Sequence, residues 1–137
     1  MSRAMLMQLD FSDDTPIYRQ IRDQLVMGIA DGRLLAGEKL PAIRALANEI
    51  GVNMMTVNKA YQLLKQEGYI TTDRRGGTLV AGQNDTVSTD KTLAELWLPA
   101  ASAKLAGMSR EQWISICGIA YDGRHPDTNK TQGEPGK

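Results

Sequence analysis

Cysteine and histidine are almost absent from this chain of 137 residues, in which Cys117 and His125 are the only residues of each type. A single thiol excludes a disulfide within the chain, and these two residues are too few for a zinc cluster of Cys and His ligands. A nucleophilic Cys–His pair is formally possible. However, Cys117 lies on the apolar stripe of a predicted helix, His125 lies in a polar segment, and no third residue is placed to orient the imidazole. We therefore predict no catalytic residues, no metal site and no cofactor.

Long apolar runs are also missing. No stretch approaches the ~18 consecutive apolar residues of a membrane helix, and the first ten residues lack the apolar core of a signal peptide. We therefore expect a cytoplasmic protein with no membrane partner. The composition, 42% hydrophobic and 23% charged, is ordinary for a globular protein, and the length favours one compact domain with an appendage over two full domains.

The chain has no excess of either charge, since 16 Lys and Arg balance 16 Asp and Glu. The positive charge is nevertheless concentrated in residues 16–82, which hold nine Lys and Arg against six Asp and Glu, a net charge of +3. Taken alone, an asymmetry of this size is more typical of a solvated surface than of a nucleic-acid interface.

A first helix is predicted from residue 16 to residue 31. Apolar side chains recur every four residues along it and therefore share one face. Pro16 suits the first turn of a helix, and the Thr15 hydroxyl is free to accept a hydrogen bond from an unpaired amide there. Gly32 ends the helix. The apolar face consists of Ile17, Ile21, Leu25 and Ile29.

Two further helices are predicted on either side of a short turn, Gly51-Val52-Asn53. The earlier helix begins at Pro41, and the later one begins after Asn53, whose side chain is the predicted N-cap, and ends near Gly68. Their apolar stripes are Ile43, Leu46, Ala47 and Ile50, and then Val57, Ala60, Tyr61 and Leu64. Two short helices joined in this way match the helix-turn-helix motif, which places its second helix in the major groove of DNA.

The outward face of the third helix supports this interpretation. Met55, Lys59, Gln62 and Gln66 point away from the apolar stripe, with Thr56, Asn58 and Lys65 on the flanks. No acidic residue occurs from residue 51 to residue 66. Amides, hydroxyls and lysines bind base edges and phosphates without repelling the polyanion. The alternative is a solvent-facing helix that happens to lack acids.

A β-hairpin is predicted after the third helix, with strands at 69–73 and 78–81. The turn, Arg74-Arg75-Gly76-Gly77, contains two glycines that allow positive φ. The arginines suit phosphates or a minor groove, whereas taken alone they also suit a solvated turn. Beside a recognition helix, the hairpin completes a winged helix-turn-helix.

The stretch from residue 16 to residue 81 resembles the DNA-binding domain of GntR-type bacterial transcription regulators. The spacing that carries the resemblance is Gly32, Leu34, Gly37, Leu40-Pro41, Arg44, Leu46-Ala47, Val52-Asn53, Thr56-Val57, Ala60-Tyr61, Leu64 and Gly68. The short remainder is similar to the YtrA subfamily, because it has no room for the larger effector-binding or aminotransferase-like domains of other subfamilies. The fold class implied is mostly α with a small β-hairpin, a winged helix-turn-helix followed by a short helical segment.

The resemblance also implies DNA contacts, by Arg44 of the second helix, by the start of the third helix and by the tip of the wing. Met55 has two open interpretations, packing on a thymine methyl group or covering a neighbouring side chain. Ala42 stands where the family usually has serine, so one hydroxyl is missing. The complete predicted DNA-binding set is Arg44, Asn53, Met55, Thr56, Asn58, Lys59, Gln62, Arg74, Arg75, Gly76, Gly77 and Thr78.

The rest of the chain is predicted as an N-terminal arm (1–15), a linker (83–89), a helical dimerisation segment (90–121) and a disordered tail (122–137). Pro99 must kink or restart the first of two helices in the helical segment, and Ser109 with Gln112 has capping-box spacing at the second. The predicted dimer contacts are Leu93, Leu96, Trp97, Trp113 and Ile116. These helices either pair with a second copy or fold back over their own domain. A small-molecule effector has room between them, but no residue identifies one.

The sequence therefore predicts a homodimeric DNA-binding transcription regulator on a palindromic operator, and a repressor in preference to an activator. The alternative is a winged-helix protein-interaction module that binds no DNA, because fold alone does not fix function. An enzyme is not expected.

Overall fold

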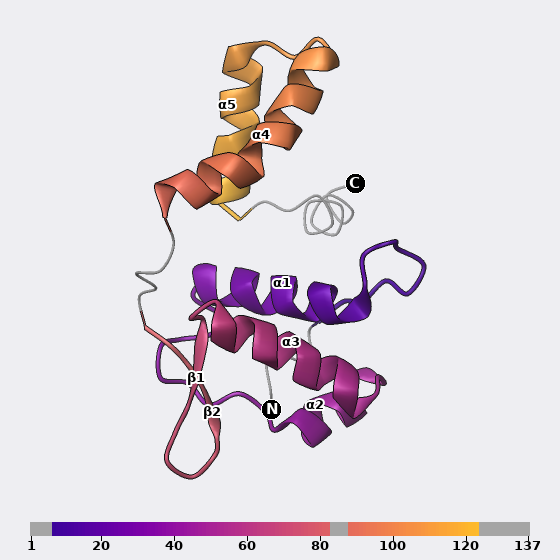
Figure 1. Ribbon diagram of the computed structural model, residues 1–137, viewed down its shortest axis with the longest axis vertical. Coiled ribbons are helices and arrows are strands. Elements are labelled where there is room, and N and C mark those ends of the chain that lie inside the picture. Colours follow the sequence, from indigo (N-terminus) through magenta and orange to yellow (C-terminus); the bar gives the residue numbers. More distant parts are fainter. Residues whose placement is uncertain (1–6, 83–87, 124–137) are drawn as a thin grey trace, which may run out of the picture. The chain divides into compact units, whose positions relative to one another are not determined.

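The computed structural model describes residues 7–82 and 88–123, which form five helices and one antiparallel hairpin (Figure 1). The helices are α1 (Ile17–Ala30), α2 (Ile43–Ile50), α3 (Met54–Gln66), α4 (Thr89–Leu105) and α5 (Arg110–Tyr121), and the strands are β1 (Ile70–Thr72) and β2 (Thr78–Val80). The predicted fold class is confirmed. The chain divides into two compact units, Met1–Thr86 and Val87–Lys137. Most of the predicted linker and all but two residues of the predicted tail lie outside the described residues.

The core of the first unit forms where α1 and α2 pack against α3 and the hairpin closes the end of α3 (Figure 1). Its buried members are Ile21, Leu25, Leu34, Leu40, Leu46, Ala47, Val57, Ala60, Tyr61, Leu64, Ile70 and Val80. Every predicted inward residue of α3 is buried. The Tyr61 hydroxyl donates a hydrogen bond of 2.8 Å to the Pro41 carbonyl, which joins α3 to the segment that leads into α2.

The turn between α2 and α3 follows the predicted chemistry. Gly51 adopts the left-handed conformation (φ +74°), which ends α2, and its amide bonds the Ala47 carbonyl. Asn53 then caps α3, because its side-chain oxygen accepts a hydrogen bond of 3.1 Å from the Thr56 amide. These two residues set the direction in which α3 leaves the turn.

The start of α1 differs from the prediction. The N-cap is Pro16, with no side-chain cap, so the expected Thr15 hydroxyl cap is wrong. The Thr15 amide bonds Asp13 and its carbonyl accepts from Gln20, which fixes the residue by its backbone. Gln20 also pairs with both backbone groups of Asp10, at 2.8 Å each. This pairing fastens the segment before α1 to the helix.

The hairpin pairs Ile70 with Val80 and Thr72 with Thr78. A third extended segment, residues 37–40, lies along β2 on its other side. Lys39 is opposite Leu79, and the Gly37 and Leu40 amides donate to β2 carbonyls at 2.8 Å each. The wing is therefore anchored at its base by the loop between α1 and α2.

The second unit is a pair of helices, α4 and α5. The N-terminus of α5 is capped as predicted. The Ser109 side chain accepts from the Gln112 amide, and the Gln112 side chain accepts from the Ser109 amide, which completes the capping box. Helix α4 begins after Ser88 and runs unbroken through Pro99, so a restart there is wrong. Its ribbon bends along its length (Figure 1).

Candidate nucleic-acid interface

The outward face of α3 is exposed and free of acidic residues. Asn58, Lys59 and Gln62 are exposed, and Met55 keeps 79% of its surface. Thr56 is half-buried on one flank. Because the opposite face fills the core, this polar face is the one that α3 is able to present to a groove of DNA.

Asn53 is also exposed, but its side-chain oxygen is used as the cap of α3. The amide nitrogen of that side chain keeps its two donors, which suit a phosphate or a base acceptor. Asn53 therefore orients the start of the helix in addition to any contact of its own.

Lys59 does not project straight outward. Its ammonium nitrogen lies 4.2 Å from the centre of the Tyr18 ring, which belongs to α1. The contact draws the charge from the middle of the outward face of α3 toward the flank where α1 packs.

Arg44 lies exposed in the first turn of α2. Within residues 7–82 and 88–123 its guanidinium has no ion pair, so its five N–H donors are open to an anion. The residue before α2, Ala42, makes no side-chain cap, as expected from the missing hydroxyl. The amides at the start of α2 are thus not capped by a side chain.

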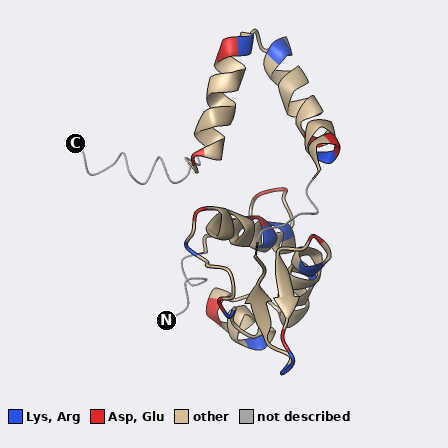
Figure 2. Cartoon of the chain, turned by 90° about the vertical axis from the view of Figure 1, so that its left-hand side faces the viewer, with Lys and Arg blue, Asp and Glu red and all other residues tan. Residues whose placement is uncertain are grey.

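The tip of the wing presents Arg74 and Arg75, both exposed, and Figure 2 shows basic residues there. Asp73, for which the sequence predicts no role, shapes the tip. The Asp73 carboxylate accepts hydrogen bonds from the Arg75 amide at 2.9 Å and the Gly77 amide at 2.7 Å. Of the two glycines in this turn, only Gly76 adopts positive φ (+83°).

Gly77 is instead closely packed at the base of the wing tip, so a side chain there would push against flexible neighbours. A Cβ atom there would lie 3.0 Å from the Lys39 Cε and 3.1 Å from an Asp73 carboxylate oxygen. Lys39 is exposed and was not predicted as a DNA contact. Its place beside the wing depends on the pairing with Leu79, which sequence periodicity does not reveal. Thr78 is half-buried at the start of β2.

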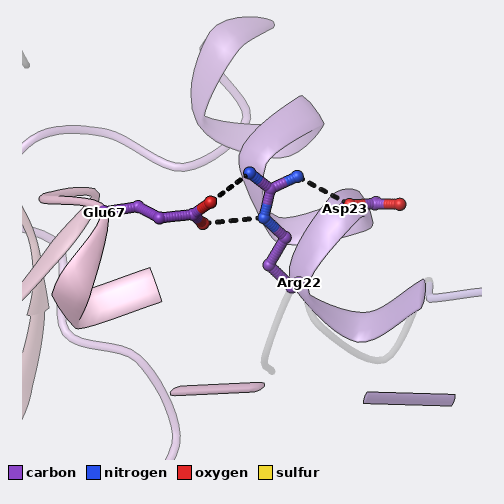
Figure 3. A network of polar contacts seen from close by, with 3 residues as sticks. All are labelled: Arg22, Asp23 and Glu67. Atoms are coloured by element: carbon purple, nitrogen blue, oxygen red, sulfur yellow. Dashed lines mark hydrogen bonds and ion pairs between the residues drawn. The ribbon is translucent and has the colours of Figure 1, made fainter. Parts of the chain in front are cut away.

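A polar network holds the end of α3 against α1 (Figure 3). Arg22 donates to both carboxylate oxygens of Glu67, at 2.8 and 2.7 Å, and to Asp23 at 2.7 Å. The hydrogen bonds to Glu67 are the main reason why the pKa of Arg22 is raised above its ordinary value. The guanidinium also lies 5.9 Å from the Tyr69 ring centre, next to β1. The network fixes the C-terminal end of α3 and Tyr69, the residue before β1, relative to α1.

The second unit exposes most of its large apolar side chains. Trp97 keeps 77% of its surface, Leu93 64%, and Leu96 and Ile116 more than two fifths each, while Trp113 is half-buried. Among the described residues of this unit, only Ala103 is buried. Of the Cys–His pair, Cys117 is half-buried in α5 and His125 lies outside the described residues. None of the described helices is both long and apolar enough to cross a membrane.

A sequence model of bacterial regulatory proteins of the gntR family matches residues 17–80. The HTH-type transcriptional repressor YtrA of Bacillus subtilis (strain 168) is 42% identical over 76 residues, which are 56% of this chain and 58% of that protein. The HTH-type transcriptional regulator YhcF of the same organism is 35% identical over 81 residues, 59% of this chain and 67% of that protein. The match to this chain thus spans less than two thirds of the length of YtrA.

Two solved structures resemble the chain over most of their lengths. YtrA from Sulfolobus acidocaldarius, a GntR-family transcription factor, has a TM-score of 0.61 and 40% identity, covering 70% of this chain and 97% of that one. A transcriptional antiterminator from Listeria monocytogenes EGD-e has a TM-score of 0.75 and 32% identity, covering 86% and 92%. The second alignment covers more of this chain than a match confined to the winged helix would.

Proposed function

Because the chain belongs to the GntR family of DNA-binding transcription regulators, we propose that it binds a specific palindromic operator as a homodimer and represses transcription. It acts by binding and not by catalysis. In this proposal α3 enters the major groove, the tip of the wing contacts the neighbouring backbone or minor groove, and Arg44 contacts DNA from α2.

The outward face of α3 is the observation that carries the proposal. It is exposed, it has no carboxylate from residue 51 to residue 66, and Asn53 and Gly51 fix its start. A face of amides, a hydroxyl and lysine offers donors to base edges and phosphates without repelling them. The proposed contacts are those predicted from the sequence, Arg44, Asn53, Met55, Thr56, Asn58, Lys59, Gln62, Arg74, Arg75, Gly76, Gly77 and Thr78, together with Lys39.

Dimerisation is supported by the exposed apolar side chains of α4 and α5. Two helices with a single buried residue have almost no core of their own, and tryptophans such as Trp97 and Trp113 are enriched at interfaces. A second copy related by a two-fold axis would cover these faces and present two α3 helices ~34 Å apart. Leu93, Leu96 and Ile116 would join the two tryptophans in that interface.

Repression follows most simply from occlusion. A small dimer that sits on a promoter blocks polymerase without needing a contact to it, and the related YtrA of Bacillus subtilis is named a repressor.

The salt dependence of DNA binding tests this function. Binding of the full chain to labelled duplex DNA is titrated at rising NaCl concentrations, with the Arg44→Ala variant alongside. If the chain contacts phosphates, the logarithm of the binding constant should fall linearly with the logarithm of the salt concentration, with a slope of about −0.9 per contact. The variant should show a shallower slope. No binding at low salt, or binding that salt does not weaken, would contradict the proposal.

A protein-interaction module is the second candidate, and the exposed thioethers favour it. Met55 is 79% and Met54 45% exposed at the start of α3, and methionine surfaces suit apolar partners. A module of that kind binds no DNA, so it would show no binding in the same titration even at low salt. The titration therefore separates the two functions.

A further inference from the structure

We propose that Lys59, held over the ring of Tyr18, binds a backbone phosphate and does not read a base, so that α1 forms part of the DNA interface. This inference rests on the proposed DNA-binding function and deepens it. Tyr18 is in this account a positioning residue that acts through Lys59.

The first step is the direction of the Lys59 side chain. On the helical wheel Lys59 lies near the middle of the outward face of α3, one turn after Met55 and almost one turn before Gln62. A lysine that extended straight from this position would reach into the floor of the groove. Its ammonium instead lies 4.2 Å from the ring centre of Tyr18, on the side where α1 packs against α3.

The second step is what lies on that side when α3 occupies a major groove. An α-helix with its side chains is about 10–12 Å across, and the groove is about 12 Å wide, so the helix fills it. An element packed on the flank of the helix therefore lies over a sugar-phosphate backbone. The Lys59 ammonium over Tyr18 is in that position, beyond reach of the base edges in the floor.

The third step is the chemistry of the group. A lysine ammonium is a compact charge with three donors, which suits a phosphate, whereas it lacks the two-pronged geometry with which arginine reads guanine. The face of the Tyr18 ring attracts the cation and occupies only one side of it. The remaining donors stay open, and the flexible stem is ordered before DNA arrives, which lowers the entropy cost of binding.

The ring, and not the phenol hydroxyl, carries this effect. We therefore expect Tyr18→Phe, which keeps the ring, to bind as the parent does. Tyr18→Leu, which keeps an apolar side chain without the ring, is expected to bind about threefold to fivefold more weakly.

The test measures fluorescence anisotropy of the full chain with two labelled duplexes at a series of NaCl concentrations. One duplex carries the sequence recovered by selection from a random pool, and the other is a scrambled duplex of equal composition. The variants are Lys59→Gln, Tyr18→Leu, Tyr18→Phe and the double variant of Lys59→Gln with Tyr18→Leu. Lys104→Gln, at the exposed end of α4, is the matched control.

Lys59→Gln is expected to weaken binding to both duplexes by a similar factor and to reduce the salt slope by about 0.9 per subunit, or about 1.8 for a dimer that carries the substitution twice. Lys104→Gln leaves the slope unchanged. Tyr18→Leu is expected to have no further effect in the Lys59→Gln background, because its effect on binding passes through the lysine. A purely structural role for Tyr18 would give the same loss in both backgrounds.

Two results overturn the inference while the proposed function stands. One is a Lys59→Gln variant that loses affinity for the selected duplex alone with an unchanged slope, which identifies Lys59 as a base reader. The other is an equal effect of Tyr18→Leu with and without Lys59. Failure of the parent chain to bind either duplex would contradict the proposed function and the inference together.

Discussion

Arg22 of α1 and Glu67, the residue that ends α3, form a two-pronged ion pair with nitrogen–oxygen distances of 2.8 and 2.7 Å (Figure 3). Both side chains keep only about a fifth of their surface, 21% and 22%. The pair is therefore shielded from water more than a surface ion pair is. It also lies where α3 ends and the hairpin begins, so it links the stability of the fold to the placement of the wing.

Arg22→Met is expected to lower the free energy of unfolding by about 1–2 kcal/mol, because Glu67 loses its two-pronged partner while half-buried. Urea unfolding followed by circular dichroism measures the change. Arg19→Met is the matched control, since Arg19 also belongs to α1, is exposed and forms no ion pair within the described residues. That variant is expected to stay within about 0.5 kcal/mol of the parent. Equal losses of unfolding free energy in the two variants would show that the ion pair between Arg22 and Glu67 stabilises the fold no more than an exposed arginine does.

Arg44→Ala is expected to weaken operator binding by about tenfold or more with little change in the thermal midpoint. The side chain is exposed and has no ion pair within the described residues, so its removal changes the stability of the fold little. One charged contact to DNA, in contrast, contributes about 1–3 kcal/mol to the free energy of binding. Electrophoretic mobility shift and differential scanning fluorimetry measure the two quantities. Arg110→Ala, at the exposed start of α5, is the control and should bind normally. Unchanged binding by Arg44→Ala would show that Arg44 of α2 does not contact DNA.

Tyr61→Phe is expected to cost about 1 kcal/mol near neutral pH, because the Pro41 carbonyl loses its 2.8 Å hydrogen bond. Burial, with a smaller contribution from Glu49, raises the pKa of Tyr61 in the folded chain. The stability that this group contributes is therefore complete below the ordinary tyrosine pKa of about 10 and is lost as the pH rises above it.

The difference in unfolding free energy between parent and Tyr61→Phe should consequently shrink above about pH 10. Urea titrations on either side of that pH measure it. The other tyrosines are present in both proteins, so their titration cancels. A difference that stays constant across this range would contradict the assignment of the hydrogen bond to a neutral, buried phenol.

Trp97→Glu is expected to convert the dimer to monomers and to abolish tight operator binding, because it places a charge in the apolar face proposed to meet a second copy. Sedimentation equilibrium and anisotropy measure the two effects. Trp97→Phe keeps an aromatic contact and is expected to remain dimeric. A parent chain that sediments as a monomer at micromolar concentration would contradict the dimer directly.

Local chemistry made most of the winged helix predictable. The cap at Asn53, the turn that begins at Gly51 and the inward face of α3 each depend on residues within a few positions of one another, and each was found as predicted. The capping box at Ser109 is of the same kind. Signals that act within one helical turn can be read from the sequence because the geometry of the turn is fixed in advance.

Contacts between distant segments were the part that the sequence did not reveal. Lys39 lies beside the wing only because its segment pairs with β2, and Tyr18 meets Lys59 only because α1 packs across α3. The wrong Thr15 cap has a local origin instead, since the nearby Asp13 and Gln20 hold that residue by its backbone. The DNA contacts of the candidate site remain predictions, because exposure and charge do not by themselves identify a bound partner.

Selection of bound fragments from a random DNA pool, carried out with the full chain at two salt concentrations, tests the central claim most directly. The account predicts enrichment of a palindrome whose half-site centres lie about one helical turn apart, with weaker recovery at the higher salt. An absence of any enriched sequence at either concentration, or an enriched site without two-fold symmetry, would contradict a homodimer that reads DNA through α3.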